Sequence, residues 1–540
     1  MDTLKLISQK EAELSELYER MDDDARLAYL DPFTLKRPDK KDTDVPGASN
    51  VTTNAPAVFL NNVISLLTTA VWQTLVEGDL TSRQERNLEQ FSYGLRYTVD
   101  ERRTRRRKPK VAHEEAAHIC LRGWIGKRCL WKQVDGKWVP DVVNVDMRWT
   151  PFEDGSDGYN WVAPRILMNK AEIEGQFGLT GVRDGVQIPV YDWWDGEKEE
   201  ILVDGKPAKT NPHRIGYPPF VILGAPEGFM VLLDGEGYLI HEGESILFLN
   251  RDMYPIWNQL LTVAQTKAVA SILPNIQHKV SELSAKPEQY PPPMAEVRQV
   301  LKDEPYEEMP SKDIPQAYVA ASEQTAAALQ RGGLPDVNYA DTATAITEQT
   351  ELRNKLLAPR LETLAQSRSL EFQMFCDMAR TGKIEATLGA PGKRASFKYT
   401  DLPDPDTYQV NYKLMSKSKK QEIANLAEAG AAKSIGLSMD TILRDILMSD
   451  DPEGEMDRID SEKAESADPA LFYFRKACAL ADEAAELTGE DADQKKLESM
   501  MMTDRGIKAL AGAPQMPGQP TPNTNALVPL LGAATKAGVA

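Results

Sequence analysis

The chain has 540 residues, of which 63 are Lys or Arg and 82 are Asp or Glu, so its formal net charge is -19. Hydrophobic residues make up 41% and aromatic residues 7%, a composition that excludes collagen-like, coiled-coil-only and wholly disordered proteins. The acidic balance argues against a protein that coats DNA by neutralising its phosphates, but not against one that handles DNA without gripping it.

The N-terminal part of the chain is predicted to be mainly helical. Helical periodicity of apolar residues covers 3–30 and 80–122. The longest apolar stretch, 55–76, approaches the length of a membrane span, but two asparagines and a glutamine interrupt it. We therefore predict a buried amphipathic helix over 55–77 and no membrane segment. The first residues lack the apolar core of a secretory signal, so we expect no such signal.

Residues 123–241 are predicted to form antiparallel strands and hairpins. Seven tryptophans lie between positions 124 and 194. Short alternating runs are separated by Asp-Gly turns, as in VDGKW at 134–138, and such turns are typical of tight hairpins. We predict that one helix, around Asn169–Phe177, interrupts the strands.

From residue 243 the pattern becomes helical again. We predict helices over 256–273 and 316–330, separated by a short Pro-rich and acidic insert over 281–315. Pro255 lies inside this helical run and is expected to kink or break it, leaving 256–273 uninterrupted, because proline removes a backbone donor and clashes with the preceding turn.

The C-terminal half begins with a Gly-Gly- and Pro-containing loop over 331–341, which opens a very long helix over 342–380. Pro359 should bend that helix, and strand-like runs follow at 394–415. The region after them is predicted to be helical, and between 440 and 500 it holds 18 acidic and 7 basic residues. The last residues are rich in Pro, Gly and Ala, which predicts a flexible tail.

No catalytic motif is present in the sequence: it has no P-loop, no GxSxG and no GxGxxG after a strand. His113 and His118, in HEEAAH, come nearest to a metal motif, but their i, i+5 spacing places the second ring about 140° around the helix from the first. Four cysteines without metal or redox spacing are interpreted as core residues in a reducing compartment. We predict that the protein is not an enzyme and uses no cofactor or metal.

The densest basic run, RRTRRRKPK at 102–110, has two interpretations. It can face nucleic acid, or it can pair with acidic helices of a neighbouring subunit. We favour the second, because the rest of the chain is acidic. The candidate residues of this inter-subunit basic patch are Arg102, Arg103, Arg105, Arg106 and Arg107.

Taken in order, these elements resemble the portal proteins of tailed bacteriophages. The most specific similarity is the start of the long helix, DTATAITEQTELRNKLLAPRLETL, because family members carry a similar pattern there. The helix, small insert and second helix resemble the family's stem–clip–stem unit. NVTTNAPAVFLNNVISLLTTAVW at 50–72 resembles the early wing helix, and NPHRIGYPPFVILGAP at 211–226 resembles the end of the wing sheet. The ordered set covers about 50–490, and no single motif is diagnostic.

The resemblance implies an α+β, mainly helical portal fold that assembles into a ring. Its parts in this sequence would be an N-terminal helix and arm at the wing periphery (1–49), the wing (50–241), a stem helix (242–280), the clip (281–315), a second stem helix (316–330), the tunnel loop (331–341), the long helix with returning wing strands (342–416), the helical crown (417–490) and a flexible tail or barrel segment (491–540).

The resemblance also implies a function and partners. Portal rings, of twelve copies in this family, sit at one capsid vertex of the virion and are assembled in the host cytoplasm. They conduct double-stranded DNA, without sequence preference, during packaging by the terminase large subunit and during ejection. They also contact the major capsid and scaffolding proteins and later the head–tail adaptor, and none of this involves a membrane. The absence of a nucleotide-binding motif agrees with a passive conduit.

Two groups of site residues follow from the resemblance. Those expected nearest the DNA, in the channel and tunnel loop, are Lys267, His278, Lys279, Arg331, Asn338 and Tyr339. Those expected on an acidic clip collar that docks the terminase and later the adaptor are Glu288, Glu304, Glu307 and Glu308. Two alternatives remain open: another oligomeric head–tail adaptor or scaffold component, and, more weakly, a metal-dependent hydrolase that uses His113 and His118.

Overall fold

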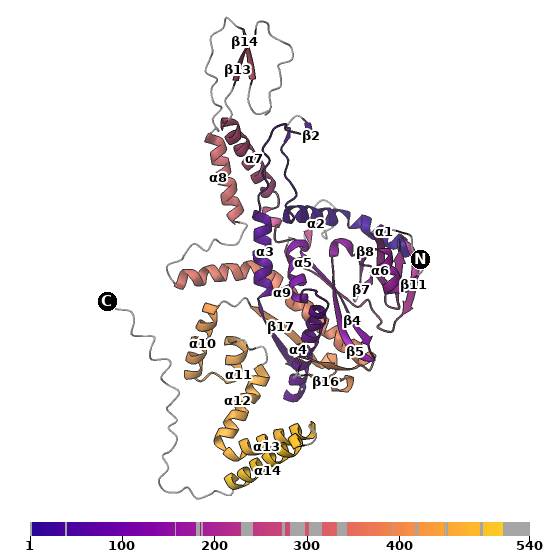
Figure 1. Ribbon diagram of the computed structural model, residues 1–540, viewed down its shortest axis with the longest axis vertical. Coiled ribbons are helices and arrows are strands. Elements are labelled where there is room, and N and C mark those ends of the chain that lie inside the picture. The colour runs from indigo at the N-terminus through magenta and orange to yellow at the C-terminus, as the bar shows by residue number, and fades with distance from the viewer. Residues whose placement is uncertain are drawn as a thin grey trace, which may run out of the picture. The chain divides into compact units, whose positions relative to one another are not determined.

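The computed structural model is a mixed helix-and-strand protein, which confirms the α+β class (Figure 1). Contacts divide the chain into two compact units, Met1–Gly430 and Ala431–Ala540. The structure describes residues 3–37, 40–156, 158–179, 184, 187–227, 241–272, 276–280, 297–301, 316–331, 343–391, 394–415, 419–447, 449, 452–486 and 490–510.

The first unit begins with helices whose apolar faces pack inward. α1 (Thr3–Glu13) and α2 (Ser15–Ala28) meet at Leu14, which is buried, and the short strands β1 (Lys36–Arg37) and β2 (Lys40–Asp44) follow. α4 (Ser82–Arg105) starts at a capping box between Thr81 and Gln84. Together with α5 (Val111–Arg122) it accounts for the helical pattern predicted over 80–122.

The prediction of one helix over 55–77 is wrong for its second half. α3 (Ala55–Thr68) ends after four turns, and β3 (Val71–Gly78) continues the chain as a strand. β3 pairs in antiparallel register along its full length with β17 (Tyr408–Met415), from Val71 opposite Met415 to Gly78 opposite Tyr408. This strand partner lies some 330 residues along the chain, beyond the reach of a local pattern.

Two antiparallel sheets follow α5. In the first, of order β12-β4-β5, the hairpin turn at Asp135 and Gly136 has positive φ at both positions, as the Asp-Gly signal predicts. In the second, the order is β11-β10-β9-β7-β6, with β8 also paired to β9, and α6 (Lys170–Phe177) lies in the sequence between β8 and β9. The strands are β4 (Trp124–Val134), β5 (Lys137–Val145), β6 (Phe152–Gly155), β7 (Gly158–Val162), β8 (Arg165–Met168), β9 (Ile188–Trp194), β10 (Lys198–Val203), β11 (Lys206–Pro212) and β12 (Phe220–Gly224).

In the described residues, three α-helices and four short strands follow, up to β17. α7 (Met253–Ile272) begins two residues before Pro255, so the proline lies in the first turn, where its missing N–H costs nothing, and the expected break does not occur. α9 (Ala343–Thr381) contains Pro359, as predicted. The remaining elements are β13 (Ile276–Val280), β14 (Val297–Leu301), α8 (Gln316–Arg331), β15 (Glu385–Leu388) and β16 (Ala395–Lys398).

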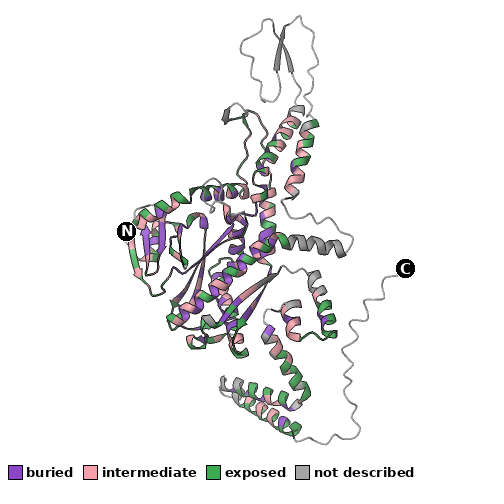
Figure 2. Cartoon of the chain, turned by 180° about the vertical axis from the view of Figure 1, so that it is seen from behind, coloured by how far each residue is buried: buried purple, intermediate pink, exposed green. Residues whose placement is uncertain are grey.

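The main core of the first unit is aromatic. Phe91 of α4 packs edge-to-face against Phe372 of α9, with ring centroids 5.7 Å apart, and Trp131 of β4 packs in the same way against Phe375 at 5.4 Å. Figure 2 shows the buried residues gathered along the strands and the helices that cover them, whereas α7 and α8 carry few. The core therefore fixes α9 to the β12-β4-β5 sheet.

The cysteine prediction is correct for three residues and wrong for the fourth. Burial raises the pKa of the Cys120 and Cys376 thiols to about 12, and it raises that of Cys129 as well. Cys478 is exposed, because α13 (Pro469–Glu486) turns the adjacent Ala477 inward instead.

The second unit is helical. α10 (Lys419–Ser434) spans the boundary between the units, and α11 (Met439–Thr441), α12 (Pro452–Ala467), α13 and α14 (Glu490–Leu510) follow. The first part of the segment assigned to a flexible tail or barrel, 491–510, lies in α14, which packs on α13, where the Ser499 hydroxyl donates to the Ala477 carbonyl at 2.7 Å. Residues 511–540 lie outside the described residues. No helix in the described part of the chain is long and apolar enough to cross a membrane.

Candidate functional site: the helix pair α7–α8

The predicted channel residues fall on several elements around α7 and α8. Lys267 lies on α7, His278 and Lys279 lie on β13, and Arg331 is the last residue of α8. Asn338, Tyr339 and the four predicted clip residues, Glu288, Glu304, Glu307 and Glu308, lie outside the described residues. β13 begins four residues after α7 ends and pairs in parallel with β14, with His278 opposite Gln299.

The two helices form a pair that carries almost no charge. α7 and α8 lie side by side in Figure 1, and the Tyr318 hydroxyl donates to the Leu260 carbonyl between them. Over both helices the sequence has three charged residues, Lys267, Glu323 and Arg331. The net charge of the pair is thus +1, in contrast to -19 for the chain. The acidity of the chain therefore resides elsewhere.

An extended segment is hydrogen-bonded along one face of α7. The backbone N–H groups of Ser49, Val51 and Thr53 donate to side-chain oxygens of Thr266, Thr262 and Asn258 at 2.9, 2.9 and 2.8 Å. Two residues of extended chain rise about 6.6 Å, and four residues of α-helix rise about 6.0 Å, so every second N–H meets every fourth helical residue. We name this arrangement the α7 ladder. Because α3 begins at Ala55, the ladder ties α7 to the body of the first unit.

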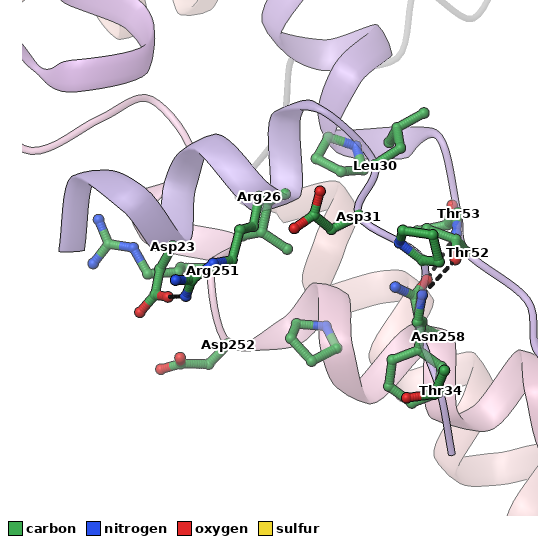
Figure 3. Close-up of a pocket in the computed structure, with 15 residues that line it drawn as sticks. Asp23, Arg26, Leu30, Asp31, Thr34, Thr52, Thr53, Arg251, Asp252 and Asn258 are labelled. Carbon is green, nitrogen blue, oxygen red and sulfur yellow. Dashed lines mark hydrogen bonds and ion pairs between the residues drawn. The ribbon is translucent and has the colours of Figure 1, made fainter. Parts of the chain in front are cut away.

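An open hollow of about 410 Å³ lies beside the ladder, between the end of α2 and the start of α7 (Figure 3). Its charged residues have both signs and include Asp23, Arg26 and Arg251. Arg26 donates to Asp23 at 2.6 Å, and Arg251 donates to Asp24 at 2.7 Å. Since these charges are already paired, the hollow offers no unpaired guanidinium for an anion and no nucleophile paired with a base.

Buried ion pairs anchor the start of α7 to its surroundings. Glu244 is fully buried and accepts from Arg251 at 2.6 Å, and its carboxylate lies 3.3 Å from Arg20 of α2. Burial alone would lower the pKa of Arg251, but the hydrogen bonds and charges of Asp24 and Glu244 raise it. Arg360 of α9 donates to the Glu244 carbonyl at 3.1 Å. The segment that leads into α7 is therefore held by α2 and α9 through buried charged groups.

The basic run at 102–110 divides into a buried and an exposed part. Arg103 is buried, pairs with Glu114 and donates to the Pro109 carbonyl at 2.8 Å, so it does not contribute to an exposed patch. Arg105 and Arg106 are exposed at the end of α4, and Arg107 follows with a φ of 59°. Arg102 is partly exposed, and its guanidinium lies 3.5 Å from the Pro140 carbonyl.

His113 and His118 lie on α5, at different depths. His113 is exposed, whereas His118 is partly buried and its burial lowers its pKa, which favours the neutral ring. In the part of the chain that the structure describes, no group of three or more His, Cys, Asp or Glu side chains could hold a metal ion.

Sequence reasoning missed a buried ionic cluster in the core of the first unit. Lys127 of β4 donates to Glu115 of α5 at 3.0 Å and to Glu371 of α9 at 2.5 Å. Arg96 of α4 donates to Glu115 at 3.0 Å, and Arg368 of α9 lies 3.8 Å from the same carboxylate. Lys127, beside Arg128 in the otherwise apolar run WIGKRCLW, was the available signal.

No protein-family model matches the chain, and no curated protein matches it.

Proposed function

We propose that the chain is the subunit of a portal ring in a tailed bacteriophage, a passive conduit at one capsid vertex. Double-stranded DNA would enter through it, driven by the terminase, and leave through it at ejection, and the head–tail adaptor would attach to it. The observation that carries the proposal is the ordered unit of α7, the β13–β14 insert and α8, followed by the 39-residue helix α9.

The low net charge of the α7–α8 pair supports the passage of DNA through a channel that does not bind it tightly. Tight non-specific binding of DNA comes from lysines and arginines that displace counterions from phosphates. α7 and α8 together carry two cations and one carboxylate, so a channel lined by copies of this pair would hold DNA weakly. Lys267, His278, Lys279 and Arg331 are the cations that we assign to the DNA path.

The α7 ladder supports the same function mechanically. A conduit helix must keep its place while a long polymer moves past it. Three hydrogen bonds from the 49–53 segment and the buried pairs of Glu244 would hold α7 against such displacement. The acidic insert over 281–315 is, in this proposal, the docking collar for the terminase and adaptor.

The decisive experiment is negative-stain imaging and native mass spectrometry of the purified protein. We expect a ring with a central hole and, for about twelve chains of 60.1 kDa, a mass of about 720 kDa. A monomer or a two-fold dimer at micromolar concentration would overturn the proposal. Charge reversal of Glu288, Glu304, Glu307 and Glu308 tests the collar separately: unchanged terminase binding would reject that assignment alone.

A further inference from the structure

The end of α4 carries a concentrated cationic surface. We define the α4 cationic end as Arg102, Arg105, Arg106, Arg107, Lys108 and Lys110. The side chains of Arg105 and Arg106 are 69% and 60% exposed. Arg105 pairs with Glu101 of its own helix at 2.6 Å, whereas the Asp141 carboxylate lies 4.0 Å from Arg106 and is also paired with Lys132 at 2.6 Å. Within the described residues, no carboxylate forms an ion pair with Arg107, Lys108 or Lys110.

The backbone at the tip of this surface favours glycine, yet it carries arginine. α4 ends in a paired turn in which the Arg107 N–H donates to the Thr104 carbonyl and the Lys108 N–H to the Arg103 carbonyl, each at 2.9 Å. The residue at the centre of such a turn has positive φ, and Arg107 has a φ of 59° where glycine would be unstrained. A strained position that keeps a guanidinium at a cationic tip points to a role for its charge.

The second unit supplies a surface of the opposite sign. α12 contains six acidic and two basic residues in 16 positions. The Asp460 side chain is 65% exposed and pairs with Lys463 of its own helix at 3.2 Å, and Glu455 pairs in the same way with Arg458. Glu462 is exposed without an ion-pair partner among the described residues. The chain thus carries two complementary surfaces, one on each unit.

We propose that the α4 cationic end of one copy docks on α12 of the next copy, an inference that rests on the proposed ring. Two cationic ends would repel each other, as would two acidic helices, so the contact joins different surfaces. A contact of this kind is heterologous and forms a closed ring when its rotation closes, whereas a two-fold dimer needs the same surface on both copies. The partner of the cationic end is therefore a second copy of this chain.

The test uses two complementary charge-reversal variants. The first is Arg105→Glu/Arg106→Glu/Lys108→Glu, which spares the buried Arg103 and the strained Arg107. The second is Glu455→Lys/Asp460→Lys/Glu462→Lys on α12. Each variant alone should lose the ring, with subunit association weakened at least about tenfold. A 1:1 mixture should restore the ring if the two variants alternate around it. The reversed, acidic α4 end of the first variant then meets the reversed, basic α12 of the second. The native α4 end of the second meets the native α12 of the first. Native mass spectrometry reads the outcome, and circular dichroism checks folding.

The matched control reverses three exposed cations on and after β11, Lys206→Glu/Lys209→Glu/Arg214→Glu, and should leave the ring intact. A milder variant, Arg105→Gln/Arg106→Gln/Lys108→Gln, guards against misfolding of the reversed one and should weaken assembly in the same direction.

Several results would overturn the contact. An intact ring in the first variant would do so. If a single chain carrying both sets of substitutions forms the ring but the mixture of the two variants does not, the α4 cationic end pairs with α12 of the same copy. Loss of duplex DNA retention with rings unchanged would make the surface a nucleic-acid site. If the wild-type protein forms no ring, the proposed function fails with the contact; if it does and mixing gives no rescue, only the contact fails.

Discussion

Lys127 has none of its side chain exposed to solvent, and its ammonium lies between two carboxylates of different helices. Burial alone would lower the pKa of Lys127, but Glu115 and Glu371 raise it, so the amine stays charged. The cluster holds three cations, because Arg96 and Arg368 are also present, against these two carboxylates. Arg368 is the least compensated: burial lowers its pKa, and the neighbouring Arg96 lowers it further.

This imbalance predicts different costs for two substitutions that each remove one cation. Lys127→Met should destabilise the first unit by about 3–5 kcal/mol, because it leaves two buried carboxylates without their closest donor. Arg368→Met should cost less than about 1 kcal/mol, because it removes the surplus charge. Urea unfolding followed by tryptophan fluorescence measures both. Equal costs would contradict this account of the cluster.

His118 should give the first unit a pH dependence of stability. Because burial lowers its pKa in the fold, the unfolded chain takes up the proton first, near its ordinary pKa of 6.5. The free energy of unfolding contributed by this residue should therefore fall as the pH decreases below about 6.5. His118→Gln should flatten the change between about pH 7.5 and 5.5, measured by urea unfolding. His113→Gln, at an exposed position of the same helix, is the control for replacing an imidazole on α5.

At the scale of elements, the α7 ladder depends on side-chain oxygens at three helical positions. Thr262 is fully buried, and its hydroxyl accepts from the Val51 N–H. Thr262→Val keeps the shape but leaves that N–H without a partner, so we expect a loss of about 1–3 kcal/mol and faster hydrogen exchange at Val51. Thr325→Val in α8 is the matched control, because the Thr325 hydroxyl only donates to the Ala321 carbonyl of its own helix. Similar effects of both changes would refute the ladder.

At the scale of the whole molecule, the charge of -19 and the nearly neutral helix pair predict weak affinity for free DNA. In about 0.15 M salt, the dissociation constant for a linear duplex should exceed about 10 µM, at the weak end for non-specific binding. Fluorescence anisotropy with a labelled duplex measures it. Submicromolar binding with a steep salt dependence would show that the protein grips DNA and would contradict a passive conduit.

The sequence alone predicted the features whose causes are local. The helix over 316–330 and the long helix over 342–380 follow from periodicity over many turns, and they match α8 and α9 within a residue at each end. The Asp-Gly hairpin turns follow from the positive φ that these residues tolerate, at 135–136 and again at 204–205.

Only the tertiary structure decided the features that depend on distant partners. β3 is a strand because β17 pairs with it, Arg103 is buried because Glu114 neutralises it, and Lys127 is buried because α5 and α9 each bring a carboxylate to it. The sequence by itself determined the α+β class and the order of the elements around α7 and α8. The tertiary structure decided which charged side chains are buried, since burying a charge is favourable only where another segment supplies its counterion.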